Sequence, residues 1–171
     1  MNKDIVLFTV RSAIKDLYAY DKQLLSQDYD IHERTVTHRL ALHLQKYYTD
    51  YHVDTEYNRM RKDYYYLNES ALKKELNWYD WGKEKNVLVY PDINVHKRDT
   101  PDNLIIIEVK MFWKSHKKKK DFIKINKYMT QLGYQYGLYV ELNKNEYSIG
   151  CGEFDLKSEP VLLTYQYTDL L

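Results

Sequence analysis

The sequence contains a single cysteine, Cys151, and only five glycines and three prolines among its 171 residues. One thiol cannot form a disulfide within the chain, and no second cysteine is present to complete a cysteine-based zinc site. We therefore expect a reducing, cytoplasmic location. The few glycines and prolines leave no linker and no repeat, so a single domain over residues 1–171 is expected.

Long apolar runs are also missing. The longest early run, Ile5 to Val10, has six residues between Asp4 and Arg11. It is too short for a membrane span or for the core of a signal peptide, so we expect no membrane partner. The sequence also has no glycine-rich phosphate loop and no G-x-S-x-G pattern, which removes the usual signals for nucleotide hydrolysis and serine catalysis.

An excess of charge of one sign is missing over the chain as a whole, but not locally. The chain has 26 Lys and Arg against 25 Asp and Glu. Between residues 110 and 127, however, eight lysines face one acid, Asp121, so that this window carries +7 and the remainder −6. Such asymmetry points to a polyanionic partner, although a solvated helix start would show the same pattern. The candidate nucleic-acid contacts are Lys114, Lys117, Lys118, Lys119, Lys120 and Lys124.

The hydrophobic pattern predicts an α/β fold. Apolar residues three and four positions apart predict helices over 6–24, 30–48 and 117–131. Runs rich in β-branched residues predict strands over 52–59, 87–96, 104–110, 136–142, 147–150 and 161–167. Asp30 and Glu33 fit a capping box, and Gly133 can end the third helix. Residues 60–86 form a polar insertion with a short helix near 70–76, so we expect one mixed sheet covered by helices.

The predicted hairpin holds the residues that suggest chemistry. Glu108 and Lys110 lie two apart in a strand and therefore share a face. Asp92 shares a face of the partner strand with Asn94 and His96. If these faces adjoin, two carboxylates and a lysine converge at one edge of the sheet. Two nearby carboxylates raise one another's pKa or recruit a cation.

Oxygen ligands without cysteine or an ordered histidine pair suit Mg²⁺ or Mn²⁺ better than zinc. Such an ion polarises a phosphoryl group and lowers the pKa of bound water, while a lysine positions or deprotonates that water. The residues thus favour hydrolysis of a phosphodiester. A purely structural hairpin with a surface ion pair is the alternative.

Pro91-Asp92, followed after a hairpin by Glu108-Val109-Lys110, resembles the signature of the PD-(D/E)xK nuclease superfamily. The resemblance implies a restriction-endonuclease-like core over about 30–142, in the order helix, three strands, helix, strand. An N-terminal helix and a β-rich C-terminal tail are extra to that core. Further similarity to small uncharacterised bacterial members lies in Glu56-Tyr57-Asn58-Arg59, and in Pro91-Asp92-Ile93 together with Val95-His96-Lys97-Arg98.

The resemblance also implies a role for each matched residue. Asp92 and Glu108 would bind Mg²⁺, or Mn²⁺, with the Val109 carbonyl as a third ligand. Lys110 would be the catalytic lysine. Many members add a glutamate from the first core helix, and Glu33 stands at that place; its helical spacing with the apolar stripe turns it inward. A polar group from the following helix often completes the site, and here Lys124 and Gln131 are both open.

The expected activity is therefore a Mg²⁺- or Mn²⁺-dependent nuclease, with DNA favoured over RNA. Because cutting both strands needs two active centres, a homodimer or a larger nuclease complex is expected. The alternative is a catalytically silent protein that binds nucleic acid or protein in a defence, repair or mobile-element system. Two single residues also have alternative interpretations. Glu33 could serve only as a helix cap. Glu56 could be an ordinary strand residue paired with Arg59, or a further acid of the site.

Overall fold

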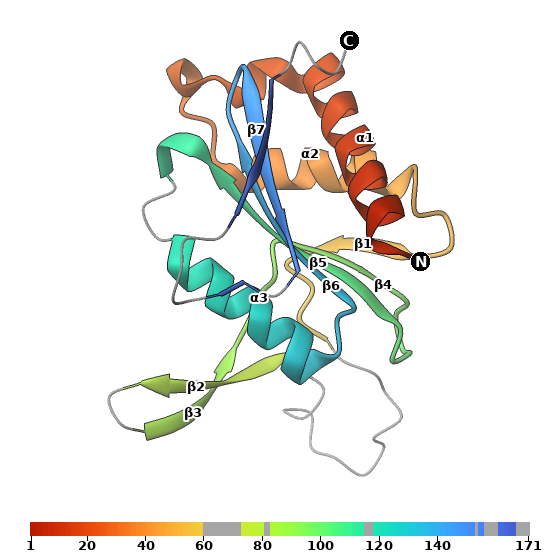
Figure 1. Cartoon of the computed structure of the whole chain (residues 1–171), viewed down its shortest axis with the longest axis vertical. Coiled ribbons are helices and arrows are strands. Elements are labelled where there is room, and N and C mark those ends of the chain that lie inside the picture. The colour runs from red at the N-terminus through yellow and green to blue at the C-terminus, as the bar shows by residue number, and fades with distance from the viewer. Residues whose placement is uncertain (60–72, 81–82, 115–117, 153, 156–160, 167–171) are drawn as a thin grey trace.

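The computed structural model describes residues 1–59, 73–80, 83–114, 118–152, 154–155 and 161–166. Within these ranges the chain has a mixed α/β fold (Figure 1). Its α-helices are α1 (Lys3–Asp21), α2 (Glu33–Gln45) and α3 (Lys118–Leu132). Its strands are β1 (His52–Thr55), β2 (Glu75–Asp80), β3 (Lys83–Leu88), β4 (Ile93–His96), β5 (Asn103–Met111), β6 (Tyr136–Leu142), β7 (Glu146–Cys151) and β8 (Leu163–Gln166). Short 3₁₀ turns cover Lys22–Leu25, Gln27–Tyr29 and Phe112–Lys114.

The central sheet has six strands in the order β1-β4-β5-β6-β7-β8, and β2 and β3 form a separate hairpin. The β5–β6 pair is parallel, and every other neighbouring pair is antiparallel. Parallel neighbours need a crossover connection, and α3 supplies it. Helix α3 is therefore the next α-helix after β5, the strand that carries Glu108 and Lys110.

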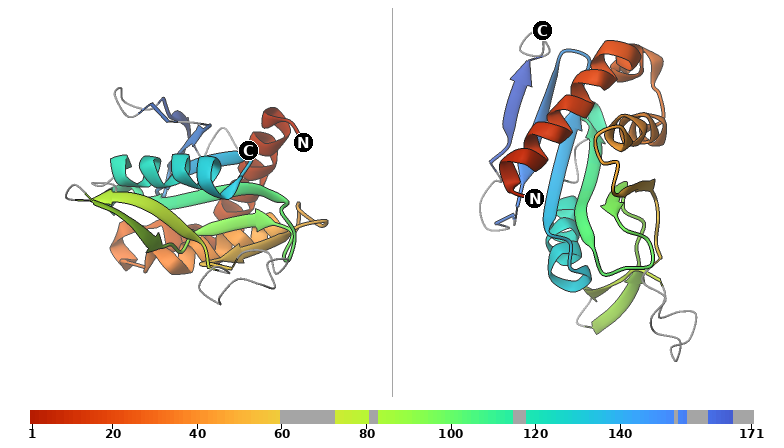
Figure 2. Two further views of the ribbon diagram at one scale, coloured as in Figure 1. Left: turned by 90° about the horizontal axis from the view of Figure 1, so that it is seen from below. Right: turned by 90° about the vertical axis from the view of Figure 1, so that its right-hand side faces the viewer.

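Helices cover both faces of the sheet (Figure 2). On one face, α1 and α2 pack on alternate residues of β5 such as Ile105, Ile107 and Val109. On the other face, α3 packs on Ile106 of β5 and on the neighbouring strand β6. A Cβ on Gly137 of β6 would lie 2.3 Å from Cγ2 of Ile125, so glycine permits the close approach of α3.

Most of the predicted elements are present, with changed ends. Helix α3 ends at Leu132, and Gly133 follows with a φ of +69°, as expected for a glycine that ends a helix. The predicted strand over 87–96 is wrong as a single element, because β3 ends at Leu88 and β4 begins at Ile93, with Pro91 between them. Strand β1 stops at Thr55, where Glu56 takes a positive φ of 51°.

Two local predictions were wrong. The capping box does not form: His32 is the N-cap residue of α2, and Asp30 lies outside the helix in a left-handed conformation. The Glu33 carboxylate turns away from the helix start toward Lys110. The short helix predicted near 70–76 is contradicted at Glu75 and Leu76, which begin β2, while its first residues lie outside the described ranges.

Candidate active site

Four of the residues predicted for the site come together at the end of β5. Glu33 is the first residue of α2, Asp92 directly precedes β4, and Glu108 and Lys110 lie on β5. Strand alternation turns Glu108 and Lys110 toward α3, whereas Val109 between them packs under α1 and α2. Three segments far apart in the sequence thus supply one polar cluster, which we call the carboxylate cluster: Glu33, Asp92, Glu108 and Lys110.

Hydrogen bonds fix Glu33 and Asp92 against β5. Lys110 Nζ lies 2.9 Å from Glu33 Oε1, and the Met111 N–H donates to Glu33 Oε2 at 3.2 Å. The Val109 N–H donates to Asp92 Oδ2 at 2.8 Å. Both carboxylates therefore accept from backbone N–H groups of β5, so their positions follow directly from that of the strand.

Glu108 is the most deeply buried of these groups, with 1% of its surface exposed. Its Oε2 accepts from Lys124 Nζ at 2.6 Å, and its Oε1 is buried with no hydrogen-bond partner among the described residues. Burial, followed by the nearby charge of Asp92, raises the pKa of Glu108 to about 8. Burial also raises the pKa of Asp92. A cation bound between these two carboxylates would stabilise the ionised form of both.

The lysines of the site stay charged. Burial alone would lower the pKa of Lys110, but Asp92, Asp121 and Glu33 outweigh it and raise that pKa. Burial likewise opposes the charged form of Lys124, yet the charge and hydrogen bond of Glu108 raise its pKa. Two ammonium groups thus offset part of the negative charge of the carboxylate cluster.

Three hollows adjoin the carboxylate cluster. One of about 460 Å³ is lined by Glu33 and Asp92, and a second of about 380 Å³ by Glu33, Lys110, Lys120 and others. The third, of about 420 Å³, is lined by Lys120, Lys124 and the end of β3. Glu33 lines the first two hollows and Lys120 lines the second and third, and we call the three together the lysine groove.

The predicted lysine run is only partly available to a ligand. Lys124 pairs with Glu108, Lys118 pairs with buried Glu141 at 2.7 Å, and Lys114 lies 3.2 Å from exposed Asp30. Lys119 and Lys120 are exposed at the start of α3. Lys117 lies outside the described ranges. Lys114 and Lys120 are exposed lysines of the run that line the lysine groove, and among the described residues Lys114 has an ion pair whereas Lys120 has none.

Lys124 and Gln131 were both candidates for completing the site, and the structure places only Lys124 there. Lys124 contacts Glu108, whereas Gln131 Oε1 accepts from the Asn77 N–H at 2.8 Å and so holds the β2–β3 hairpin against α3. Glu56 does not pair with Arg59 as predicted; its Oε1 lies 2.8 Å from Nε of Arg34.

His96 lies outside the carboxylate cluster, at the far end of β4. Its Nε2 lies 2.9 Å from Asp54 Oδ2 on β1, so this histidine interacts with a different acid from the one whose face it was expected to share.

Sequence reasoning missed three buried groups near the site. Asp121 lies 3.9 Å from Lys110 Nζ, Glu141 lies next to Lys110 in the β5–β6 register, and Tyr128 has a pKa raised by burial and by the charges of Glu108 and Asp92. The signal for two of them was present: Asp121, Lys124 and Tyr128 are three and four residues apart and share a helix face.

The side chains of the carboxylate cluster provide some, but not all, of the ligands that a hard divalent ion needs. Asp92 and Glu108 supply carboxylate oxygens, one of them buried without a partner, and the Val109 carbonyl lies on the segment between Glu108 and Lys110. No group of three or more His, Cys, Asp or Glu side chains with metal-binding geometry occurs in the described ranges. An ion here would therefore take its remaining ligands from the backbone and from water, as Mg²⁺ commonly does.

Comparisons with known proteins give no relative: no family model, no curated protein and no solved structure matches the chain. None of the helices in the described part of the chain is long and apolar enough to cross a bilayer.

Proposed function

We propose that the chain is a metal-dependent nuclease with a restriction-endonuclease-like core. The observation that supports this most strongly is the convergence of Asp92, Glu108 and Lys110, with Glu33, beside a groove that Lys120 and Lys124 also line. A Mg²⁺ or Mn²⁺ ion bound by Asp92, Glu108 and the Val109 carbonyl would polarise the phosphoryl group and lower the pKa of a bound water.

The side chains have separate tasks in this proposal. Asp92 and Glu108 bind the ion, and Glu33 orients Lys110 through the 2.9 Å contact. Because the neighbouring acids keep Lys110 protonated, its ammonium neutralises charge that develops on the phosphate rather than accepting a proton. Lys120, exposed in the groove, contacts the backbone of the substrate.

DNA is the substrate we favour, and cleavage of a duplex would require two copies of the chain or a partner nuclease. We also propose that the protein acts in the cytoplasm, where a single unpaired cysteine remains reduced. Cys151 is half-buried and forms no disulfide.

One contact favours a second function. The 2.6 Å pair between Lys124 and Glu108 already places a cation on the proposed metal ligand. If that pair persists, the chain is a catalytically silent binding module of the same fold. Metal titration separates the two functions, because the silent module would bind no divalent ion at Glu108.

The test is cleavage of single-stranded and duplex DNA, and of RNA, with Mg²⁺ or Mn²⁺. We expect activity that Asp92→Ala and Lys110→Ala abolish while circular dichroism shows the fold intact. Asp102→Ala and Lys144→Ala are matched controls, since both remove the same charges at positions away from the site and should cut normally. Equal cleavage by all four variants would sink the proposal.

A further inference from the structure

A buried lysine at the opposite end of β4 plays no part in the carboxylate cluster. Lys74 is 1% exposed. Among the described residues its Nζ contacts three neutral oxygens: Tyr134 Oη at 2.7 Å, the Tyr57 carbonyl at 3.2 Å and Asn94 Oδ1 at 3.3 Å. None of the ion pairs among the described residues includes Lys74. A buried ammonium without a counter-ion is costly, and a neutral side chain of similar size would avoid that cost.

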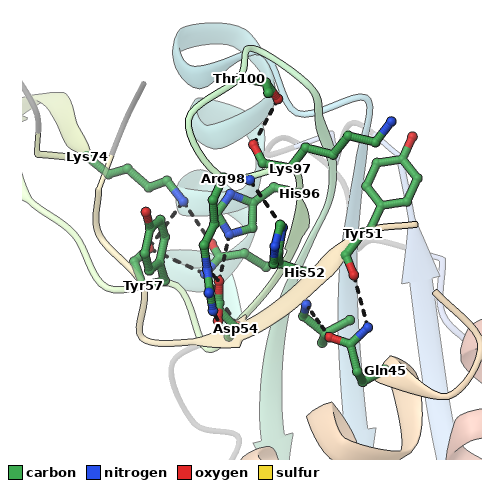
Figure 3. A network of polar contacts seen from close by, with 12 residues as sticks. Gln45, Tyr51, His52, Asp54, Tyr57, Lys74, His96, Lys97, Arg98 and Thr100 are labelled. Atoms are coloured by element: carbon green, nitrogen blue, oxygen red, sulfur yellow. Dashed lines mark hydrogen bonds and ion pairs between the residues drawn. The ribbon is translucent and has the colours of Figure 1, made fainter. Parts of the chain in front are cut away.

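The described acid whose charge acts on Lys74 is Asp54, and it already has other partners (Figure 3). Asp54 of β1 accepts from His96 at 2.9 Å and from Arg98 Nε at 2.9 Å, and Arg98 Nη2 donates to its second oxygen. Although burial opposes the charged form, these two partners keep the pKa of Asp54 well below its usual range. Asp54 is therefore committed to His96 and Arg98, and it offsets the charge of Lys74 only weakly.

Lys74 adjoins a hollow of about 220 Å³. Arg59 and Lys97 also line it, against one lining acid, Asp99. Lys97 has its own partner, since its Nζ lies 3.4 Å from Asp102 Oδ2. The described lining thus carries an excess of positive charge around a buried lysine that has no ion pair with any described acid.

We propose that this hollow is a second anion site, in which Lys74 and Arg59 bind a phosphate monoester. A phosphate monoester carries close to two negative charges and three strong acceptor oxygens, so it can contact a buried ammonium and a rim guanidinium at once. The same group occurs on free nucleotides and at the 5′ end of a nucleic-acid strand.

This site is separate from the carboxylate cluster. Asp92 precedes the first residue of β4 and His96, beside the hollow, is its last, which places them about 13 Å apart along the strand. Burial lowers the pKa of Lys74 to about 7, so that an anion bound beside it would favour the protonated form. The proposal does not require that the carboxylate cluster cut nucleic acid.

The experiment is calorimetric titration of the metal-free full chain with inorganic phosphate, with adenosine monophosphate, and with a short oligonucleotide bearing either a 5′-phosphate or a 5′-hydroxyl. We expect saturable binding of phosphate and of the monophosphate, weakened at least tenfold in Lys74→Met. Preference for the 5′-phosphorylated strand over both free ligands would assign the strand end as the source; equal or tighter binding of the monophosphate would assign the free nucleotide.

Three further variants keep the result decisive. Arg59→Met changes an exposed rim residue and should weaken binding several-fold even if Lys74→Met fails to fold. Lys120→Met removes a cation from the lysine groove, and Lys144→Met removes an exposed one between β6 and β7; both should bind phosphate normally. No saturable binding by the unaltered chain up to millimolar ligand, or loss of binding only in Lys120→Met, would overturn the proposal.

Discussion

Replacing Glu108 by glutamine should stabilise the protein in the absence of metal. The pKa of this carboxyl is raised from an ordinary value of 4.5 to about 8, chiefly by burial and then by Asp92. The folded state therefore binds more protons than the unfolded state between these two values, and stability falls as the pH rises through that window. The loss of stability caused by ionising Glu108 is absent below about pH 4.5 and complete above about pH 8.

The size of the effect follows from the two pKa values. A difference of this size corresponds to about 3 kcal/mol at pH 7 and about 5 kcal/mol above pH 8, as upper limits. Glu108→Gln keeps the shape of the side chain and removes its titration. The unaltered protein should thus lose several kcal/mol relative to the variant between pH 5 and pH 8.

Urea unfolding of both proteins, followed by circular dichroism at several pH values without divalent ions, measures that difference directly. Taking the difference removes the contributions of other titrating groups such as Lys74 and His96. Glu141→Gln is the matched control for the loss of a buried carboxylate, because Glu141 is also a buried glutamate paired with a lysine. Parallel pH curves for the unaltered protein and Glu108→Gln would refute the reasoning.

Three further predictions follow from single contacts. Asp54→Asn weakens the bonds from His96 and Arg98 and should cost about 1–3 kcal/mol in urea unfolding at pH 7. Asp102→Asn changes a carboxylate that pairs with a partly exposed lysine and also interacts with Tyr51, and it should cost at most about 1 kcal/mol. A similar penalty for both would contradict the Asp54 assignment. Gly137→Ala should lower stability by about 1–3 kcal/mol, since its Cβ would meet Ile125 at 2.3 Å; an unchanged melting temperature would contradict the packing of α3. In filter binding, DNA affinity should fall with salt, and Lys120→Ala should reduce the slope of log K against log salt by about one; an unchanged slope would remove Lys120 from the interface.

The parts of the site that the sequence predicted are those that local patterns determine. Strand alternation is enough to put Glu108 and Lys110 on one face, and helical spacing with Val36 and Leu40 is enough to turn Glu33 inward. The proline before Asp92 shows where a strand is interrupted, although the pattern alone did not show that β3 and β4 are different strands.

What the sequence left open depends on tertiary packing. The choice between Lys124 and Gln131 follows from how α3 crosses β6, which Gly137 permits by lacking a Cβ. The contact of His96 with Asp54 depends on the register of β1 against β4, in which His52 pairs with His96. The register brings together Asp54 and His96, which lie 42 positions apart, and the crossing brings Ile125 of α3 onto Gly137 of β6. Neither can be derived from periodicity, because periodicity describes one element at a time.

The 77-residue separation between Glu33 and Lys110 has a consequence for biosynthesis. Closing so long a loop is slow, and the contact requires α2, β4 and β5 to be in place at the same time. An incompletely folded chain therefore has no assembled carboxylate cluster. A protein built this way assembles the carboxylate cluster only after the ribosome has released α2, β4 and β5.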